Sequence, residues 1–115
     1  MSIMNFRRYA RVEVEIPVKF LLAGREEPME AFLANISEEG ASLICAFSLT
    51  VATPLVFNIP LPNIAEPVNV KAEVLWSRPA TVNGRQGYAH GLLFKRLDVA
   101  DRDRLHEFIS QAMSY

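Results

Sequence analysis

Regular alternation of apolar and polar residues is the sequence feature that most constrains the fold of this chain. From position 12 to position 22 every even-numbered residue is apolar, and Glu13, Glu15 and Lys19 lie between them. Successive side chains of a β-strand point to opposite faces, so a period of two predicts a strand that buries one face. Pro17 falls on the polar side of the pattern, which suits a strand edge or a β-bulge.

Five more segments carry strand patterns, and turn signals separate them. The predicted strands are 12–22, 30–37, 41–47, 55–61, 68–76 and 88–94. Residues 37–40 and the pair Asn83-Gly84 are predicted to be hairpin turns, and Gly40 is expected to supply a positive φ in the first. Because strands joined by such short turns pair antiparallel, the pattern predicts a small antiparallel barrel or curled sheet.

The last segment changes to a helical period. Its apolar residues form one stripe at helical spacing: Leu105, Phe108, Ile109, Ala112 and Met113. Asp98 suits the N-cap position of this helix. The chain is therefore predicted to be mainly β and a single domain over residues 1–115, with a flexible arginine-rich arm at 1–11, a six-stranded antiparallel β-barrel at 12–97 and one C-terminal α-helix at 98–113.

Charge and composition exclude several classes of function. Lysine and arginine number 12 against 13 aspartate and glutamate residues, and this near balance disfavours a general nucleic-acid binder. Cys45 is the only cysteine, so an internal disulfide is impossible and a reducing, cytoplasmic location is expected. The N-terminus lacks the pattern of a signal peptide, and no apolar run reaches the roughly 20 residues that span a membrane.

Enzymatic and metal-dependent functions find no support in the sequence motifs. His90, His106 and Cys45 share no usual metal-ligand spacing with one another or with nearby carboxylates. There is no serine in a nucleophile elbow and no glycine-rich phosphate loop ahead of a helix. We therefore expect a binding protein rather than an enzyme, with no metal and no cofactor.

Arginines are concentrated near the N-terminus, where Arg7, Arg8 and Arg11 fall within five residues. A guanidinium donates two parallel hydrogen bonds to a phosphate or to a guanine edge, and its flat face stacks on a base. This cluster could bind a planar anionic ligand, or it could be a solvated basic tail. Arg78 and Arg96, near strand ends, could enlarge the positive field around the site, but we interpret them as solvated charges.

A second polar group ends the second predicted strand. Asn35 and Ser37 have the same strand parity, so their side chains are expected on one face, while Ile36 points into the core. An amide and a hydroxyl side by side can read the edge of a base, and Gly40 leaves room beside them. The alternative is that both side chains stabilise the hairpin through local bonds to the backbone.

The two motifs together resemble the PilZ family. They are R-x-x-x-R at Arg7 and Arg11, and N-x-S-x-x-G from Asn35 to Gly40. The order of the elements, Trp76 near the end of the fifth strand, and the segment 87–94 add to the likeness. Members of this family look like six-stranded antiparallel barrels with a C-terminal helix, and many bind the bacterial second messenger cyclic di-GMP.

The resemblance implies both a ligand and the residues that bind it. The implied cyclic di-GMP-binding residues are Arg7, Arg8, Arg11, Asn35, Ser37 and Gly40. The arginines would hold phosphate and stack on or pair with guanine, the polar pair would hydrogen-bond the ligand from the barrel surface, and the glycine would shape the turn. Trp76 shares the parity of the apolar face of its strand, so it is expected in the core; alternatively, one ring face meets the ligand.

The leading hypothesis is a cyclic di-GMP receptor that signals to an effector protein when its N-terminal arm becomes ordered. One alternative is a PilZ-fold protein-interaction module that acts without nucleotide. Another, a small barrel that binds single-stranded nucleic acid, is disfavoured by the near-neutral charge. The expected partners are thus cyclic di-GMP and an unidentified effector protein, with no nucleic acid polymer and no membrane insertion.

Overall fold

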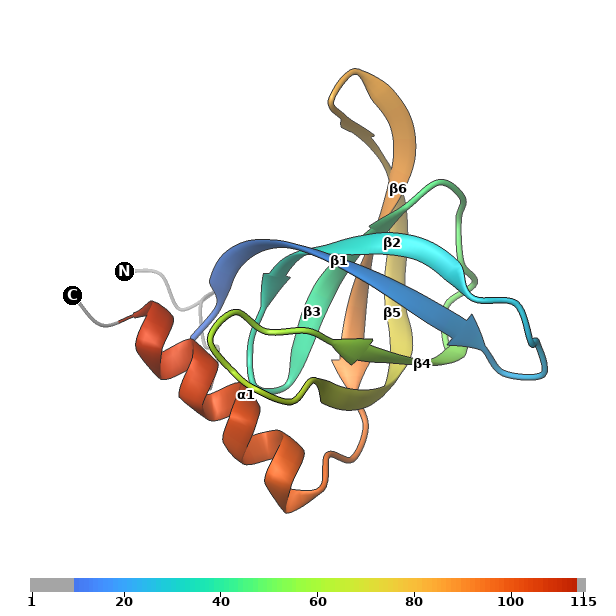
Figure 1. Cartoon of the computed structure of the whole chain (residues 1–115). Coiled ribbons are helices and arrows are strands. Elements are labelled where there is room, and N and C mark those ends of the chain that lie inside the picture. Colours follow the sequence, from blue (N-terminus) through green and yellow to red (C-terminus); the bar gives the residue numbers. More distant parts are fainter. Residues whose placement is uncertain (1–9, 114–115) are drawn as a thin grey trace, which may run out of the picture.

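The computed structural model describes residues 10–113, and their backbone confirms the predicted fold class. The strands are β1 (Val12–Leu22), β2 (Met29–Ile36), β3 (Gly40–Cys45), β4 (Pro54–Ile59), β5 (Val68–Val82) and β6 (Arg85–Phe94), and the helix is α1 (Val99–Ala112). Neighbouring strands pair antiparallel and close a barrel in the order β1-β2-β3-β6-β5-β4. Helix α1 lies against one end of this barrel (Figure 1).

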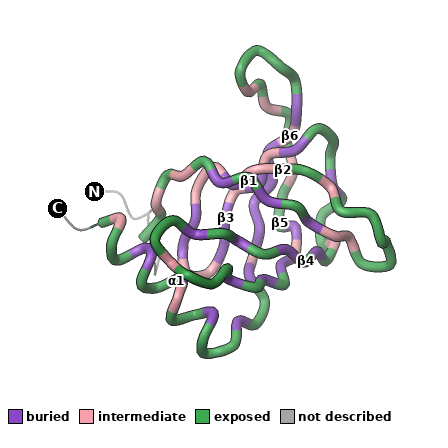
Figure 2. The backbone as a smooth tube through the Cα atoms, in the orientation of Figure 1, coloured by how far each residue is buried: buried purple, intermediate pink, exposed green. Residues whose placement is uncertain are grey.

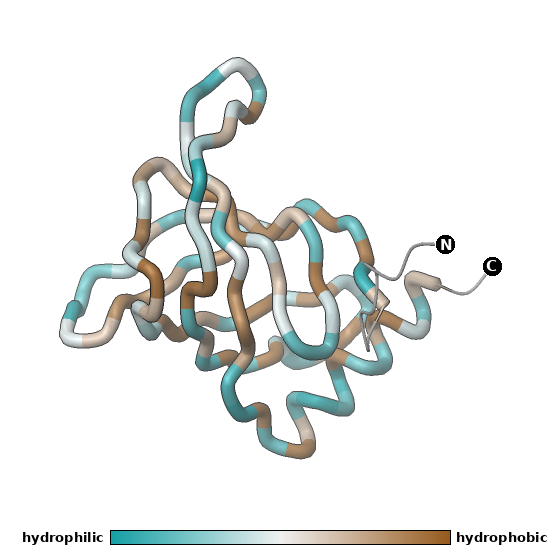
Figure 3. The backbone as a smooth tube through the Cα atoms, turned by 180° about the vertical axis from the view of Figure 1, so that it is seen from behind, coloured by the Kyte–Doolittle hydropathy of each residue, from teal (hydrophilic) through white to brown (hydrophobic). Residues whose placement is uncertain are grey.

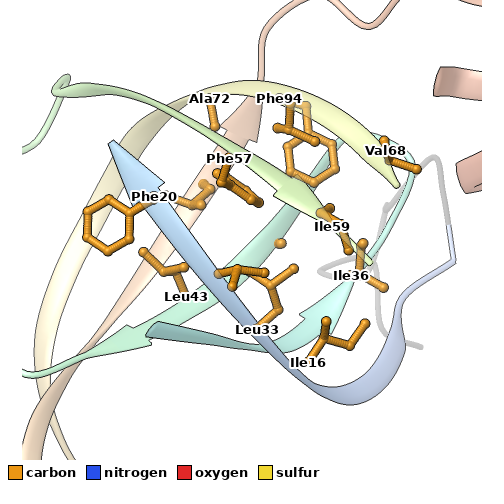
Figure 4. Close-up of a cluster of buried hydrophobic side chains, with 14 of the residues drawn as sticks. Ile16, Phe20, Leu33, Ile36, Leu43, Phe57, Ile59, Val68, Ala72 and Phe94 are labelled. Carbon is orange, nitrogen blue, oxygen red and sulfur yellow. The ribbon is translucent and has the colours of Figure 1, made fainter. Parts of the chain in front are cut away.

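The core of the barrel is built by the alternation that the sequence shows. On β1, Ile16 and Phe20 are buried and the residues next to them in the strand are exposed or only half-buried. Buried side chains from different strands point toward one another inside the ring (Figure 4). Burial (Figure 2) and hydropathy (Figure 3) alternate along the strands, and Leu105 and Phe108 of α1 join the same cluster. Each large apolar side chain buried in this way contributes about 1.5–3 kcal/mol.

Three β-bulges interrupt the regular pairing of the strands. The register shifts between Glu13 and Ile16 on β1, between Leu33 and Asn35 on β2, and between Val74 and Trp76 on β5. A bulge adds one residue to a strand, bends it and increases its twist, which helps a small sheet to close. Each bulge also changes the face on which the following side chains lie, so the bulges decide which residues reach the outer surface.

The observed strands differ from the predicted ones mainly at β5 and β6. Both are longer than predicted, because β5 continues to Val82 and β6 begins at Arg85. Their outer parts form a two-stranded ribbon that projects from the barrel (Figure 1). Pro79 and the loss of clear alternation around it concealed this extension in the sequence. The expectation that Pro17 lies at a strand edge or a bulge is confirmed, because it lies beside a bulge and in the part of β1 that pairs with β2 alone.

One expectation about the hairpin turns is confirmed and another is wrong. Asn83 and Gly84 join β5 to β6 with φ values of 53° and 77°, which is the left-handed pair typical of a two-residue hairpin. Gly40, by contrast, does not have a positive φ. A glycine is required there because β6 passes close by: a Cβ at this position would lie 2.2 Å from the carbonyl oxygen of Leu92.

The start of α1 is fixed to the barrel by two aspartates. Asp98 caps the helix as predicted and accepts a hydrogen bond from the backbone N–H of Asp101 at 2.9 Å. The buried carboxylate of Asp101 accepts hydrogen bonds from the backbone N–H of Asn69 at 3.0 Å and from Arg104 at 2.6 Å. Burial raises the pKa of Asp101, but these hydrogen bonds outweigh it and lower the pKa overall. The ionised carboxylate therefore ties the first turn of α1 to the start of β5.

His90 on β6 is a fully buried histidine whose two ring nitrogens are both engaged. Its Nε2 accepts a hydrogen bond from the backbone N–H of Leu49 at 3.0 Å, so the ring proton lies on Nδ1, which donates to the carbonyl of Leu43 at 3.2 Å. Burial lowers the pKa of His90, and the bond to Leu43 opposes this only in part. The folded protein therefore holds this side chain in its neutral form.

We expect the protein to lose stability as the pH falls below about 6.5, the ordinary pKa of histidine, because the unfolded chain then binds a proton that folded His90 resists. Each unit by which the pKa is lowered is worth about 1.4 kcal/mol of unfolding free energy once the pH is below both values. Urea unfolding over a series of pH values measures this loss in the wild type and in His90→Gln.

The variant should lose the pH dependence in that window, because its side chain has no proton to gain. His106→Gln is the control at the other histidine: His106 lies exposed on α1 beside Glu38, and its replacement should leave the contribution of His90 in place. An unfolding free energy of the wild type that stays constant from neutral pH to about pH 5 would contradict the assignment.

Candidate ligand-binding site

A row of paired residues crosses four strands on the outer face of the barrel. Asn35 of β2 pairs with Ser42 of β3. Ser42 pairs in turn with Gly91 of β6, which pairs with Trp76 of β5. Leu43, next to Ser42, is fully buried, so the alternation along β3 turns Ser42 outward. The strand register therefore brings residues from distant parts of the sequence to one place.

Arg11, Asn35 and Ser42 form a hydrogen-bonded chain along one side of this row. Arg11 donates from Nη1 to Oδ1 of Asn35 at 2.6 Å. Asn35 donates from Nδ2 to Oγ of Ser42 at 3.0 Å. The two bonds fix the orientation of the amide, and the amide in turn holds the guanidinium beside β2. One predicted ligand arginine thus lies next to the polar residue with which it was predicted to act.

These side chains surround a hollow of about 260 Å³. Its lining includes Arg11, Asn35, Ser42, Trp76, Arg78 and Gly91. Two guanidinium groups, an amide, a hydroxyl and an indole therefore face one small space. Guanidinium groups bind phosphates and guanine edges, and flat groups stack on bases, so this set is suited to an anionic ligand that carries a purine.

The expectation that Trp76 lies in the core is wrong. The bulge between Val74 and Trp76 places both Leu75 and Trp76 outside the barrel, and Trp76 is 38% exposed. Its indole rests against the backbone of β6, since a Cβ on Gly91 would lie 2.1 Å from the indole Nε1. The guanidinium carbon of Arg78 lies over the ring, 4.7 Å from its centre. Trp76 is therefore a wall of the hollow, and a contact between its ring and a ligand stays a prediction.

Ser37 lies apart from the hollow, buried in the turn between β2 and β3. Its Oγ accepts hydrogen bonds from the backbone N–H groups of Glu39 and Gly40, each at 3.2 Å. Ser37 also donates its backbone N–H to the carbonyl of Gly40 at 2.8 Å. These bonds match the local stabilising role considered from the sequence, and a contact between Ser37 and a ligand stays a prediction.

Arg7 and Arg8 lie outside the described residues. Ser42 and Arg78 are part of the hollow but were not predicted as site residues. Ser42 could have been found from its polar place between two buried residues of β3. Arg78 could have been found from its distance to Trp76 in the sequence. It follows Trp76 by two residues on the same strand, so the two side chains share one face.

A larger hollow of about 600 Å³ lies on the outer face of β1, β4 and β5. Lys19, Lys71 and Arg96 contribute to its lining, but none of the motif residues that the structure describes does. Because the strand order is circular, β4 lies across the barrel from β3, and β1 lies across from β6. We take the smaller hollow as the candidate site because three of the predicted ligand residues, Arg11, Asn35 and Trp76, meet there.

Other kinds of site find no structural counterpart within residues 10–113. In that range no group of three or more His, Cys, Asp or Glu side chains could hold a metal ion. No helix there is both long and apolar enough to cross a bilayer. Cys45 is a free, buried thiol, and burial raises its pKa.

Gly91→Ala should displace the indole of Trp76, because the added Cβ would lie 2.1 Å from its Nε1. We expect a changed emission of Trp76, the only tryptophan of the chain, and a loss of stability of about 1–3 kcal/mol in thermal or urea unfolding. The same glycine substitution in a Trp76→Ala background should cost much less, since the ring that clashes is gone. Equal costs in the two backgrounds would show that the contact is not made.

Comparison with solved structures gives several proteins of the same fold. MotI/DgrA, an inhibitor of motility from Bacillus subtilis, has 20% identity and a TM-score of 0.73, covering 93% of this chain and 51% of its own. MrkH from K. pneumonia, in complex with c-di-GMP, has 16% identity and a TM-score of 0.73, covering 91% and 51%. The PilZ domain of YcgR from Escherichia coli, with c-di-GMP, has 12% identity and a TM-score of 0.72, covering 92% and 91%.

This chain spans about half the length of MotI/DgrA and of MrkH. No curated protein sequence matches it. The family model of the PilZ domain matches residues 5–111, which is nearly the whole sequence. The closed six-stranded barrel and the polar residues gathered on its outer face agree with this match. The protein therefore belongs to the PilZ domain family.

Proposed function

We propose that this protein is a cyclic di-GMP receptor of the cytoplasm, and not an enzyme. The observation that carries the proposal is the meeting of Arg11, Asn35 and Trp76 around one hollow on the outer face of a PilZ-family barrel. Two of the similar structures, MrkH and the PilZ domain of YcgR, are complexes with c-di-GMP. Their shared fold supports the same class of ligand for this chain.

The chemistry of cyclic di-GMP matches the groups that line the hollow. The ligand carries two phosphates and two guanine bases. The guanidinium of Arg11 suits a phosphate or the O6/N7 edge of guanine. Because Asn35 holds Arg11 and Ser42 holds Asn35, this donor is oriented before the ligand arrives, which lowers the entropic cost of binding. The indole of Trp76 adds an aromatic wall.

The remaining residues of the two motifs enter the proposal in different ways. Arg7 and Arg8 supply further guanidinium contacts to the ligand from the N-terminal arm. Gly40 contributes through shape, since it lets β6 approach the end of the turn. Ser37 holds that turn closed, and a direct contact with the ligand requires its hydroxyl to exchange a backbone partner for a ligand atom.

In the proposed signal, the ligand binds residues 1–11 to the barrel. This ordering changes the surface that the protein offers to an effector protein. The size of the hollow supports this mechanism, since about 260 Å³ is below the roughly 300–1,000 Å³ typical of ligand sites. A ligand with two nucleotides therefore needs further walls. Arg7 and Arg8 lie four and three residues before Arg11 in the sequence and can supply them.

Isothermal titration calorimetry with cyclic di-GMP tests the receptor directly. We expect saturable binding by the wild type, and at least a tenfold loss of affinity in Arg11→Ala and Asn35→Ala, because a charge-assisted hydrogen bond is worth about 1.5–3 kcal/mol. Lys19→Ala is the matched control, since it removes a positive charge from the opposite side of the barrel. Absence of binding by the wild type, or equal affinities of all four proteins, would reject the proposal.

The mechanism through the arm has a separate test. Amide hydrogen exchange in residues 1–11 should slow when cyclic di-GMP is added, because the ligand then bridges the arm to the barrel. The strands of the barrel, already hydrogen-bonded, should change little and serve as the internal control. If the nucleotide binds while exchange in residues 1–11 stays the same, the receptor is retained and the arm mechanism is wrong.

The alternative function is a PilZ-fold interaction module that acts without nucleotide. The larger hollow beside Lys19, Lys71 and Arg96 is a surface on which an effector could dock in either case. Capture of the same protein partners with and without cyclic di-GMP, together with no calorimetric signal for the nucleotide, would favour this alternative.

A further inference from the structure

Arg78 belongs to neither sequence motif, yet its side chain lies in the candidate site. It lines the same hollow as Arg11 and Asn35. Its guanidinium carbon lies 4.7 Å from the centre of the Trp76 ring, which is a cation–π contact, and tryptophan is the best partner for such a contact. A base that approaches this face of the indole therefore meets the guanidinium before it meets the ring.

The backbone holds this pair of side chains in place. Trp76 and Arg78 are two residues apart on β5 beyond the bulge, so their side chains leave the same face of the strand. Pro79 restricts the backbone of the residue before it to extended conformations. The indole also rests on the backbone of β6 at Gly91. The indole therefore contacts both the backbone of β6 and the guanidinium of Arg78.

We propose that Arg78 stays on Trp76 in the complex and presents the outer face of its guanidinium to a guanine base of cyclic di-GMP. The base then stacks on the arginine, and the arginine stacks on the indole. This inference rests on the proposed function and names a further specificity-determining residue for it. Guanidinium planes accept bases as aromatic rings do, and this plane is positioned before the ligand arrives.

The competing arrangement is one in which Arg78 moves away and the base stacks on the indole itself. That movement would give up the cation–π contact, which costs free energy. The two arrangements differ in what touches the indole. In the first, the ring keeps the neighbour that it has without ligand; in the second, it gains a purine.

Trp76 is the only tryptophan of the chain, so its fluorescence reports which arrangement forms. At saturating cyclic di-GMP we expect only a small change in the emission of the wild type. In Arg78→Ala the base can reach the indole, and strong quenching is expected. Affinity should fall roughly tenfold in Arg78→Ala, and nearly as far in Arg78→Lys, because lysine keeps the charge and loses the plane.

Arg85→Ala is the matched control, because Arg85 is exposed on the same β5–β6 hairpin and does not line the hollow. It should bind like the wild type and show the same small emission change. If the wild type does not bind cyclic di-GMP in calorimetry, the proposed function itself is wrong.

If the wild type binds, three results overturn the role of Arg78 alone. The first is an affinity of Arg78→Ala equal to that of the control. The second is full affinity in Arg78→Lys. The third is quenching of the wild type as strong as that of Arg78→Ala.

Discussion

Closure of six strands into one ring is the constraint on which the rest of the structure depends. A closed ring must fill its interior with the alternate side chains of every strand, and it must accommodate their twist. The barrel does so with breaks in register on β1, β2 and β5. Two of these breaks lie beside Asn35 and Trp76, and they set polar and aromatic side chains on the outer face. The fold and the candidate site therefore have a common physical origin.

Much of the fold could be predicted because its signals are local. Each strand carries its own alternation, and Asn83-Gly84 and Asp98 mark a hairpin and a helix start by the chemistry of their side chains and backbones. Trp76 could not be placed in this way, since its parity assigns it to the core and only the pairing of β5 with β6 reveals the bulge. Likewise, position 40 requires a glycine because β6 passes close to it, and no local sequence pattern shows that another strand lies there.

The candidate site was predictable only where a motif marked it. Arg11 and Asn35 were predicted to act together, and a hydrogen bond of 2.6 Å joins them. Ser42 and Arg78 were missed because each becomes informative only through its neighbour, Ser42 through the amide of Asn35 and Arg78 through the ring of Trp76. Ser37 is the reverse case, since its motif position drew attention while its hydroxyl is engaged in the turn.

The projecting ribbon of β5 and β6 extends the two strands that carry Trp76 and Gly91. Beyond Glu73 and Tyr88 these strands pair only with each other, and the ribbon ends at Asn83 and Gly84. Tyr88 lies opposite Pro79, and a strand rises about 3.3 Å per residue, so the tip stands roughly 13 Å beyond the last residues that β3 holds, and a tilt of about five degrees there displaces it by roughly 1 Å. The ribbon is thus a lever arm whose base lies where β6 leaves β3, so a small tilt there becomes a larger displacement at its tip.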